Sequence, residues 1–175
     1  EQDFLSCSYG FRPGRSAHQA LATVRSELMD MHGGWVIEAD IQDCFGGFDH
    51  EWMRKIFDRR IRDGVLIRTI GKWLNAGIME AEERTKPTKG TPQGGVISPL
   101  LANIFLHDVL DAWFHRYALP LIGGRAALVR YADDFVILCE RKDDAERFLR
   151  GIYPRFEKFG LLLHPEKTKL VPFKR

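Results

Sequence analysis

Two short runs of branched and aromatic residues, 128–131 and 135–139, flank the pair Asp133-Asp134 and constrain the fold more than any other feature of the sequence. Two such runs separated by polar turn residues predict a β-hairpin. Both runs have the composition of core strands, where an uncompensated charge is costly. The sequence therefore predicts a hairpin that carries two carboxylates at its turn, close to the core.

The first part of the chain predicts a helix followed by a strand. Ser16 and Gln19 form a capping box, and apolar residues at helical spacing extend the helix to about His32. Residues 35–41 alternate between apolar and more polar side chains, which is typical of a strand with one face in the core. Asp40 stands near the end of this strand, on its less apolar face.

Further helices and one more strand complete the pattern. Apolar residues at helical spacing predict four more helices, which begin near Asp49, Ile67, Ser98 and Ala145. Pro99 favours the helix start at Ser98, because proline suits the first helical turn and lacks a donor that would be orphaned there. Gly160 then opens a short strand over residues 161–163.

The order of these elements predicts the fold class. With residues 50–97 set aside, the order is strand, helix, strand, strand, helix, strand, which is that of a ferredoxin-like α+β fold with an antiparallel sheet backed by helices. Residues 50–97 would be an insertion beside the sheet. In this topology the first strand and the hairpin are neighbours at the sheet centre, so Asp40 is expected close to Asp133 and Asp134.

Three carboxylates brought together at pH 7 need a counter-charge. Two ionised groups about 4 Å apart repel by about 4 kcal/mol at an effective dielectric of about 20. Either one carboxyl keeps a proton, or a divalent cation lies between them, and an all-oxygen site suits Mg²⁺. We favour the metal, since two ions about 3.5 to 4 Å apart would support nucleotidyl transfer. The alternative is a strand-end cap at Asp40 and ordinary turn chemistry at Asp133-Asp134.

Composition limits the class of protein. The 175 residues, 45% apolar and 29% charged, suffice for one domain with a core. A net charge of +2 predicts no overall attraction to nucleic acid, so such contacts would depend on local clusters. Three separated cysteines suit a reducing compartment, and no apolar run approaches the roughly 18 residues of a membrane span. A cytoplasmic protein without membrane contact is expected, as an excised piece of a longer chain.

Several blocks of the sequence resemble those of one known family. Residues 131–134, Tyr-Ala-Asp-Asp, match the YxDD signature of reverse transcriptases, and residues 90–104 resemble a long block typical of group II intron-encoded enzymes. Residues 8–16, 39–50 and 160–171 resemble the family's upstream, first catalytic and late blocks. Because the blocks follow the family's order over nearly the whole chain, it is identified as a member of the group II intron-encoded reverse transcriptase/maturase family.

The resemblance implies a polymerase palm with part of the fingers. The palm core would cover about residues 35–49 and 98–173, and the fingers portion, built of helices and a hairpin, about 1–34 and 50–97. The thumb would be absent, because the chain ends just before the family's primer-gripping block. Such a fragment is expected to hold the chemistry and to be weak or inactive alone.

The resemblance also implies the site residues. Asp40 and Asp133 would be ligands of two Mg²⁺ ions, with Mn²⁺ as a substitute, and Asp134 would complete the triad more loosely. Phe45 would pack under the incoming sugar and exclude a 2′-hydroxyl; the alternative is a plain core phenylalanine. Gln93 and Gly94 would lie near the templating pair, and the alternative is an ordinary glycine-rich turn.

Basic residues supply the remaining candidates. Lys167 matches a lysine proposed to assist the pyrophosphate leaving group as an acid or point charge. Arg12 and Arg15 match a block that contacts template or nucleotide. A local basic stretch suits phosphates, at Arg84, Lys86 and Lys89. Each of these could instead be a solvated charge, and Arg130 could be a structural ion-pair partner of the acidic cluster.

The sequence departs from the family's pattern in the loop after Asp40. Cys44 stands where the family has an aromatic residue, and Gly46-Gly47 replace a stiffer pair. The loop between Asp40 and Asp49 is therefore expected to be looser than usual, and to hold Phe45 less firmly.

The leading hypothesis is an RNA-directed DNA polymerase of the group II intron type, which joins dNTPs to a DNA or RNA primer on an RNA template with Mg²⁺. The alternative is a non-catalytic RNA-binding maturase scaffold that assists the splicing of a group II intron RNA. The intact triad and Phe45 favour the enzyme. A metal-dependent phosphodiesterase is disfavoured by the block over residues 90–104.

Overall fold

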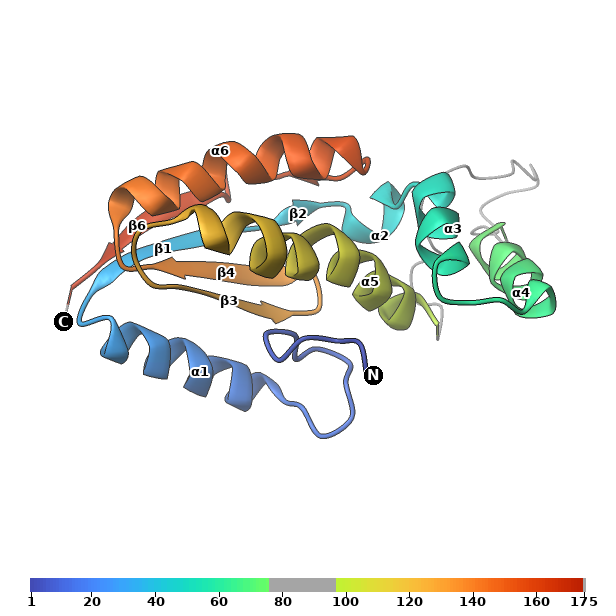
Figure 1. The fold of residues 1–175 in the computed structure, drawn as a ribbon, viewed down its shortest axis with the longest axis horizontal. Helices are drawn as coiled ribbons and strands as arrows, with labels where there is room; N and C mark the ends of the chain where they lie inside the picture. Colours follow the sequence, from blue (N-terminus) through green and yellow to red (C-terminus); the bar gives the residue numbers. More distant parts are fainter. Residues whose placement is uncertain (76–96, 175) are drawn as a thin grey trace.

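The computed structural model describes residues 1–75 and 97–174, and its centre is a four-stranded antiparallel sheet (Figure 1). The strands lie in the order β3-β4-β1-β6. Their bounds are Gly34–Ala39 for β1, Ala126–Tyr131 for β3, Asp134–Cys139 for β4 and Lys169–Phe173 for β6. Because β1 pairs with the second strand of the β3–β4 hairpin, the predicted hairpin and the ferredoxin-like arrangement are both confirmed.

The fourth strand of this sheet is not the one predicted from the sequence. The prediction was residues 161–163, but β5 covers Leu162–Leu163 and pairs with the short strand β2, Ile41–Gln42, outside the main sheet. The fourth position belongs to β6, whose Pro172 lies opposite Trp35. Proline removes a ladder donor, which an edge strand tolerates. The strand β6 therefore forms through its pairing with β1, although its local composition does not predict a strand.

One face of the sheet is covered by two long helical segments. α6 spans Lys142–Lys158. The other segment begins with α5, Ser98–Leu106, and Pro99 stands in its first turn as predicted. It continues through the π-helical stretches η1 (His107–Asp111) and η2 (Phe114–Ala118) to the 3₁₀ turn η3 (Leu119–Leu121). The main core lies between these segments and the sheet, and its fully buried members include Ile37, Phe105, Leu110, Ile137 and Phe156.

The opposite face of the hairpin is covered by α1, Ala17–Asp30, which runs beside β3 (Figure 1). Its N-terminus has the predicted capping box between Ser16 and Gln19. Val129 and Val136 are paired across the hairpin and pack with side chains of α1 in a small separate cluster. Successive residues of a strand face opposite sides, so the hairpin contributes to both cores.

The helices α2, α3 and α4, which follow β1 and β2 in the sequence, lie beyond one end of the sheet (Figure 1). α2 spans Cys44–Gly47, α3 spans His50–Asp58 and α4 spans Gly64–Asn75. Asp49 caps α3 as predicted, since its Oδ1 accepts hydrogen bonds from two backbone amides of the first turn. Within residues 1–75 and 97–174, no helix has the length and apolar character needed to cross a membrane.

Candidate active site

The β3–β4 hairpin places Asp133 and Asp134 at one end of the sheet. Tyr131 and Asp134 are its last paired residues, so Ala132 and Asp133 form a two-residue turn. Ala132 has a φ of 59°, in the left-handed region that such hairpin turns require at their first central position. Ala132 is buried, Asp133 is half-buried and Asp134 is exposed. The turn therefore leaves both carboxylates accessible.

Asp40 reaches the same end of the sheet from β1. The strand predicted over residues 35–41 is divided at Asp40, because the chain leaves the main sheet there and joins β2. Ala39, the last residue of β1, lies opposite Phe135, so Asp40 and Asp134 are the next residues beyond this last pair. Neighbouring strands are about 4.8 Å apart. The structure thus brings together three predicted site residues, here called the acidic trio: Asp40, Asp133 and Asp134.

The charges of the acidic trio oppose one another. Partial burial raises the pKa of Asp134, and the negative charges of Asp133 and Asp40 raise it further, whereas Lys167 lowers it. A carboxylate beside two like charges is stabilised only by a proton or a cation. The arrangement therefore favours binding of positive charge at this end of the sheet.

One cation of the protein itself already lies at the trio. Lys167 Nζ donates to Asp40 Oδ2 at 2.7 Å, and this hydrogen bond raises the pKa of Lys167. The backbone holds the two residues near each other, because the amide of His164 donates to the carbonyl of Asp40 at 2.8 Å. The Lys167 side chain is 63% exposed. Solvent therefore screens the pair, and its partners can exchange.

The donor set of the trio suits a divalent metal ion. Carboxylate oxygens are ligands that Mg²⁺ takes from proteins, and the ammonium group at Asp40 shows that a positive charge is accommodated there. In the part of the chain that the structure describes, no three His, Cys, Asp or Glu side chains surround one point closely enough to hold a metal ion. Metal binding at the trio would therefore require its carboxylates to move closer together, and Asp40 to release Lys167.

Phe45 lies on α2, in the loop that follows Asp40. Asp43 begins this short helix with a φ of 44°, and its side chain accepts a hydrogen bond from the amide of Gly46. The loop predicted to be loose therefore contains a defined, capped turn. Phe45 is half-buried, and its ring meets that of Phe48 edge to face, with 6.1 Å between centroids. Packing fixes one side of the Phe45 ring and leaves part of it accessible.

Cys44, which precedes Phe45 on α2, is only 3% exposed and belongs to the main core. Burial raises the pKa of the Cys44 thiol, and the negative charge of Asp133 raises it further. The N-terminus of α2 is therefore close enough to the hairpin turn for the charge of Asp133 to act on Cys44.

The two arginines predicted to contact template or nucleotide have different surroundings. Arg12 Nη1 donates to the carbonyls of Leu5 at 2.8 Å and Ser8 at 2.7 Å, and its side chain is 7% exposed. Arg15 is exposed, and its guanidinium lies over the ring of Tyr9 at 5.1 Å from the centroid. Arg12 therefore stabilises the N-terminal loop, whereas Arg15 is accessible to a ligand.

Several predicted residues lie outside the described part of the chain. These are Gln93, Gly94 and the basic stretch of Arg84, Lys86 and Lys89. Of the block over residues 90–104, the structure describes 97–104, which form the turn before α5 and most of that helix. The roles assigned to the others stay predictions.

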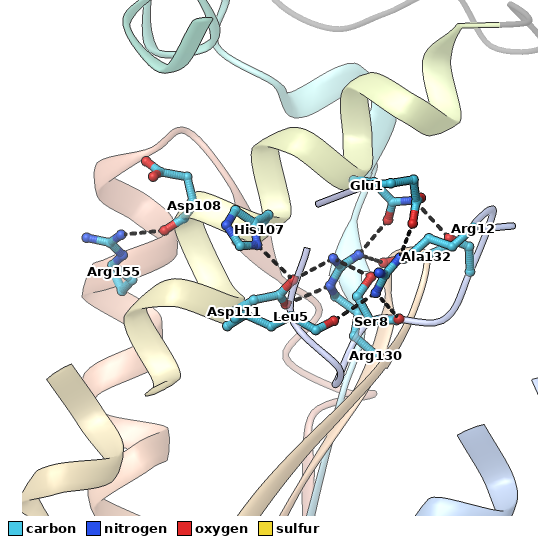
Figure 2. A network of polar contacts seen from close by, with 12 residues as sticks. Glu1, Leu5, Ser8, Arg12, His107, Asp108, Asp111, Arg130, Ala132 and Arg155 are labelled. Atoms are coloured by element: carbon cyan, nitrogen blue, oxygen red, sulfur yellow. Dashed lines mark hydrogen bonds and ion pairs between the residues drawn. The ribbon is translucent and has the colours of Figure 1, made fainter. Parts of the chain in front are cut away.

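Arg130 pairs with a residue that the sequence analysis did not identify (Figure 2). Its guanidinium donates to the two carboxylate oxygens of Asp111 at 2.8 and 2.7 Å, and both side chains are 0% exposed. Burial alone would lower the pKa of Arg130 and raise that of Asp111, but their attraction reverses both shifts. Arg130 is therefore the ion-pair partner of Asp111, and not of the acidic trio.

Asn103 and Ser8 complete this buried group. Asn103 Oδ1 and Ser8 Oγ accept hydrogen bonds from Arg130 at 2.8 and 2.9 Å. A sequence signal for the group exists, since Asn103 and Asp111 stand in a predominantly apolar helical stretch and Arg130 stands in a predominantly apolar strand. A buried charge needs a partner, but that rule does not say which of several acidic residues supplies it.

Comparison with known proteins gives a family match over almost the whole chain. The family described as "Reverse transcriptase (RNA-dependent DNA polymerase)" matches residues 2–174. Protein YkfC of Escherichia coli (strain K12) is 36% identical, over 97% of this chain and 52% of its own length. Group II intron-encoded protein LtrA of Lactococcus lactis subsp. cremoris is 43% identical, over 62% of this chain and 18% of its own length.

This chain spans about half the length of YkfC and about a fifth of LtrA. Among solved structures, telomerase from Candida tropicalis in complex with the TWJ fragment of telomeric RNA has a TM-score of 0.74 at 14% identity. The match covers 95% of this chain and 30% of that one. At this identity the likeness shows a common fold, that of a palm-type domain with helices on an antiparallel sheet.

Proposed function

The chain belongs to the reverse transcriptase family, in its group II intron-encoded branch, and we propose that it carries the catalytic centre of an RNA-directed DNA polymerase. The acidic trio is the observation that supports this most. Three aspartates lie at the same end of the sheet, and a positive charge already lies at Asp40. Clustered like charges are costly, and a chemical role for a bound cation explains the arrangement.

Asp40 and Asp133 are the proposed ligands of two Mg²⁺ ions, with Asp134 as a looser third ligand and Mn²⁺ as a substitute metal. When bound, the ions would stabilise the charge of a transferring phosphoryl group and activate a hydroxyl nucleophile. The fold contributes rigid placement. The Asp40 carbonyl accepts a hydrogen bond from the amide of His164, and Asp133 lies in a two-residue hairpin turn.

The proposed reaction joins a dNTP to the 3′-hydroxyl of a primer. The hydroxyl oxygen forms a bond to the α-phosphorus and loses its proton, and the bond to pyrophosphate breaks. Lys167 is proposed to exchange its contact with Asp40 for one with the triphosphate, where its ammonium assists the leaving group as an acid or point charge. The exposure of the Lys167–Asp40 pair supports this exchange.

The proposed substrates and partners are dNTPs, a primer, an RNA template and a group II intron RNA. Phe45 is proposed to contact the sugar with the accessible part of its ring. Arg12, Arg15, Gln93 and Gly94 are proposed to contact nucleotide or template, and among the described ones Arg15 is the more accessible. The telomerase of the same fold, solved with a fragment of telomeric RNA, supports an RNA partner.

A maturase scaffold is the second candidate, and the likeness to the intron-encoded LtrA favours it. The two proposals differ in what they require of the trio. A scaffold binds RNA without needing three aspartates in one place, whereas a polymerase loses its chemistry when one ligand is removed.

The test is primer extension on an RNA template by the full-length protein and its Asp133→Asn variant. A bound metal supplies several kcal/mol, and about 1.4 kcal/mol is tenfold in rate, so extension should fall by at least about 100-fold. RNA affinity should be unchanged. Asp143→Asn, which removes an exposed carboxylate paired with Arg141, is the matched control and should extend normally. Equal extension by Asp133→Asn would overturn the polymerase, and RNA binding without any extension would favour the scaffold.

A further inference from the structure

We propose that a buried polar network positions the turn that carries Asp133 and Asp134, and that its arginine and aspartate are positioning residues for the reaction. The inference rests on the proposed polymerase function. The network, called here the Arg130 network, consists of Ser8, Asn103, Asp111, Arg130 and the carbonyl of Ala132, and Figure 2 labels all of these residues except Asn103.

Arg130 uses every one of its donors in this network. Nε and Nη2 donate to Asp111, Nη2 also donates to Ser8 Oγ, and Nη1 donates to Asn103 Oδ1. The fifth hydrogen bond runs from Nη1 to the carbonyl of Ala132 at 2.7 Å. A guanidinium has five N–H donors in a fixed planar fork. The orientation of Arg130 is therefore fully determined, and its contact with the turn has a single geometry.

Ala132 is the residue that needs such support. A non-glycine residue in the left-handed region costs about 1–2 kcal/mol, and Ala132 adopts a φ of 59°. Strain of this kind persists where the surroundings over-determine the conformation. The carbonyl of Ala132 belongs to the peptide bond that leads into Asp133, so the hydrogen bond from Arg130 fixes the backbone from which the first carboxylate of the turn projects.

The N-terminal segment closes the other side of the turn. The amide of Arg130 donates to the carbonyl of Cys7, and the amide of Tyr9 donates to the carbonyl of Arg130, both at 2.8 Å. Gly10 follows directly, and a Cβ at this position would lie 2.3 Å from the amide nitrogen of Ala132. Asn103 Nδ2 donates to the Gly10 carbonyl at 2.8 Å. Backbone and network together leave the turn no room to shift.

The helical segment after α5 supplies the counter-charge through an unusual geometry. Asn103 and Asp111 are eight residues apart, and on a regular α-helix they would point about 80° away from each other. Asp111 belongs to the π-helical stretch η1, whose wider turns change this angle, and both residues bind Arg130. Arg155 of α6 donates to the carbonyls of Asp108 and Val109 at 3.0 Å. It thereby holds the stretch in place.

A positioning role differs from a stabilising one in what a variant should change. Buried ion pairs stabilise folds no better than well-packed apolar side chains do, but they impose one hydrogen-bond geometry. A displacement of about 1 Å at a reacting group lowers a rate about 100-fold. Loss of the network should therefore lower the maximal rate more than the loss of stability predicts.

The experiment compares Arg130→Lys, which keeps the charge and removes the fork, with Asp144→Asn in the full-length protein. Asp144 is 1% exposed and accepts hydrogen bonds from the amides of Gly123 and Gly124, before β3 begins and so at the end of the hairpin away from the turn. Both variants lose hydrogen bonds of a buried side chain, but only Arg130→Lys changes a hydrogen bond to the turn. Gly10→Ala is a second variant, which presses on the turn without changing any charge.

Four measurements are made for each variant: the urea midpoint, the steady-state kinetics of dNTP addition, which give kcat and KM, the affinity for RNA, and hydrogen exchange of the amides from Ala132 to Phe135 without substrate. We expect Arg130→Lys and Gly10→Ala to lower kcat about 100-fold with KM and RNA affinity unchanged, and to exchange faster at the turn. Asp144→Asn should lose stability and keep kcat. Equal kcat and equal exchange in all three would overturn the positioning role.

Hydrogen exchange separates this inference from the proposed function. If the wild-type protein extends no primer, the polymerase proposal fails, and protection of the turn in wild type that is lost in Arg130→Lys still supports the network's role. If the enzyme is active but the turn amides exchange equally in Arg130→Lys and wild type, the inference fails and the polymerase remains.

Discussion

The two sides of the acidic trio are held by different kinds of interaction. Asp133 and Asp134 belong to a turn whose backbone carbonyl, that of Ala132, accepts a hydrogen bond from Arg130. Arg130 and Asp111 are completely buried. Asp40, on the other side, has an ion pair with Lys167 in which the side chains are 30% and 63% exposed. The hairpin side therefore depends on a buried hydrogen-bond network, and the Asp40 side on a single ion pair that solvent screens.

Because of this difference, one side of the trio is rigid and the other can exchange its partner. A buried charge that loses its partner is left without compensation, so the Arg130 network cannot rearrange without a large cost in free energy. An exposed pair loses little when it opens, because water replaces the lost hydrogen bond. The turn therefore fixes where the carboxylates lie, and Asp40 can exchange its ammonium partner for another cation.

The largest effect is expected from Arg130→Met. This substitution leaves Asp111 buried without a counter-charge and should lower the free energy of unfolding by about 3–5 kcal/mol. Urea unfolding measures the change. Arg125→Met, which removes an exposed arginine paired with Glu27 just before the same strand, is the control and should leave the midpoint unchanged. Similar midpoints for the two variants would remove the contrast between the two sides.

A smaller effect is expected from Phe45→Val, on the exchangeable side. The sugar contact of one side chain is worth about 1–3 kcal/mol, so discrimination of dNTPs against ribonucleotides should fall about tenfold or more while the fold persists. Ratios of kcat/KM for the two nucleotides test this. Leu162→Ala, an exposed apolar residue in β5, serves as the control. Unchanged discrimination in Phe45→Val would leave Phe45 as a residue of the core.

The smallest effect on stability is expected from Lys167→Met. Exposed ion pairs frequently contribute nothing measurable to folding, so the urea midpoint should match that of the wild type. Primer extension by the same variant should slow, because its proposed partner is the leaving group and not the fold. A midpoint lowered as far as that of Arg130→Met would mean that the Asp40 side is as fixed as the turn.

Local sequence patterns predicted much of the fold. The capping box at Ser16, the cap at Asp49 and the hairpin around Asp133-Asp134 depend on residues close in sequence, and all three are present. The ferredoxin-like order follows from the succession of elements. The prediction of the fourth strand is wrong, because the apolar run over residues 161–163 indicates a strand of the main sheet. The fourth strand is β6, which forms through its pairing with β1.

The sequence by itself determined the hairpin, the order of the elements and therefore the approach of Asp40 to Asp133 and Asp134, because short-range periodicity and turn chemistry specify them. Only the tertiary structure decided what supports the turn. Arg130 meets Asp111, Asn103 and Ser8 across 19, 27 and 122 residues of sequence. Such partners are selected by burial, which leaves a charge no alternative to the polar groups that the folded chain brings beside it.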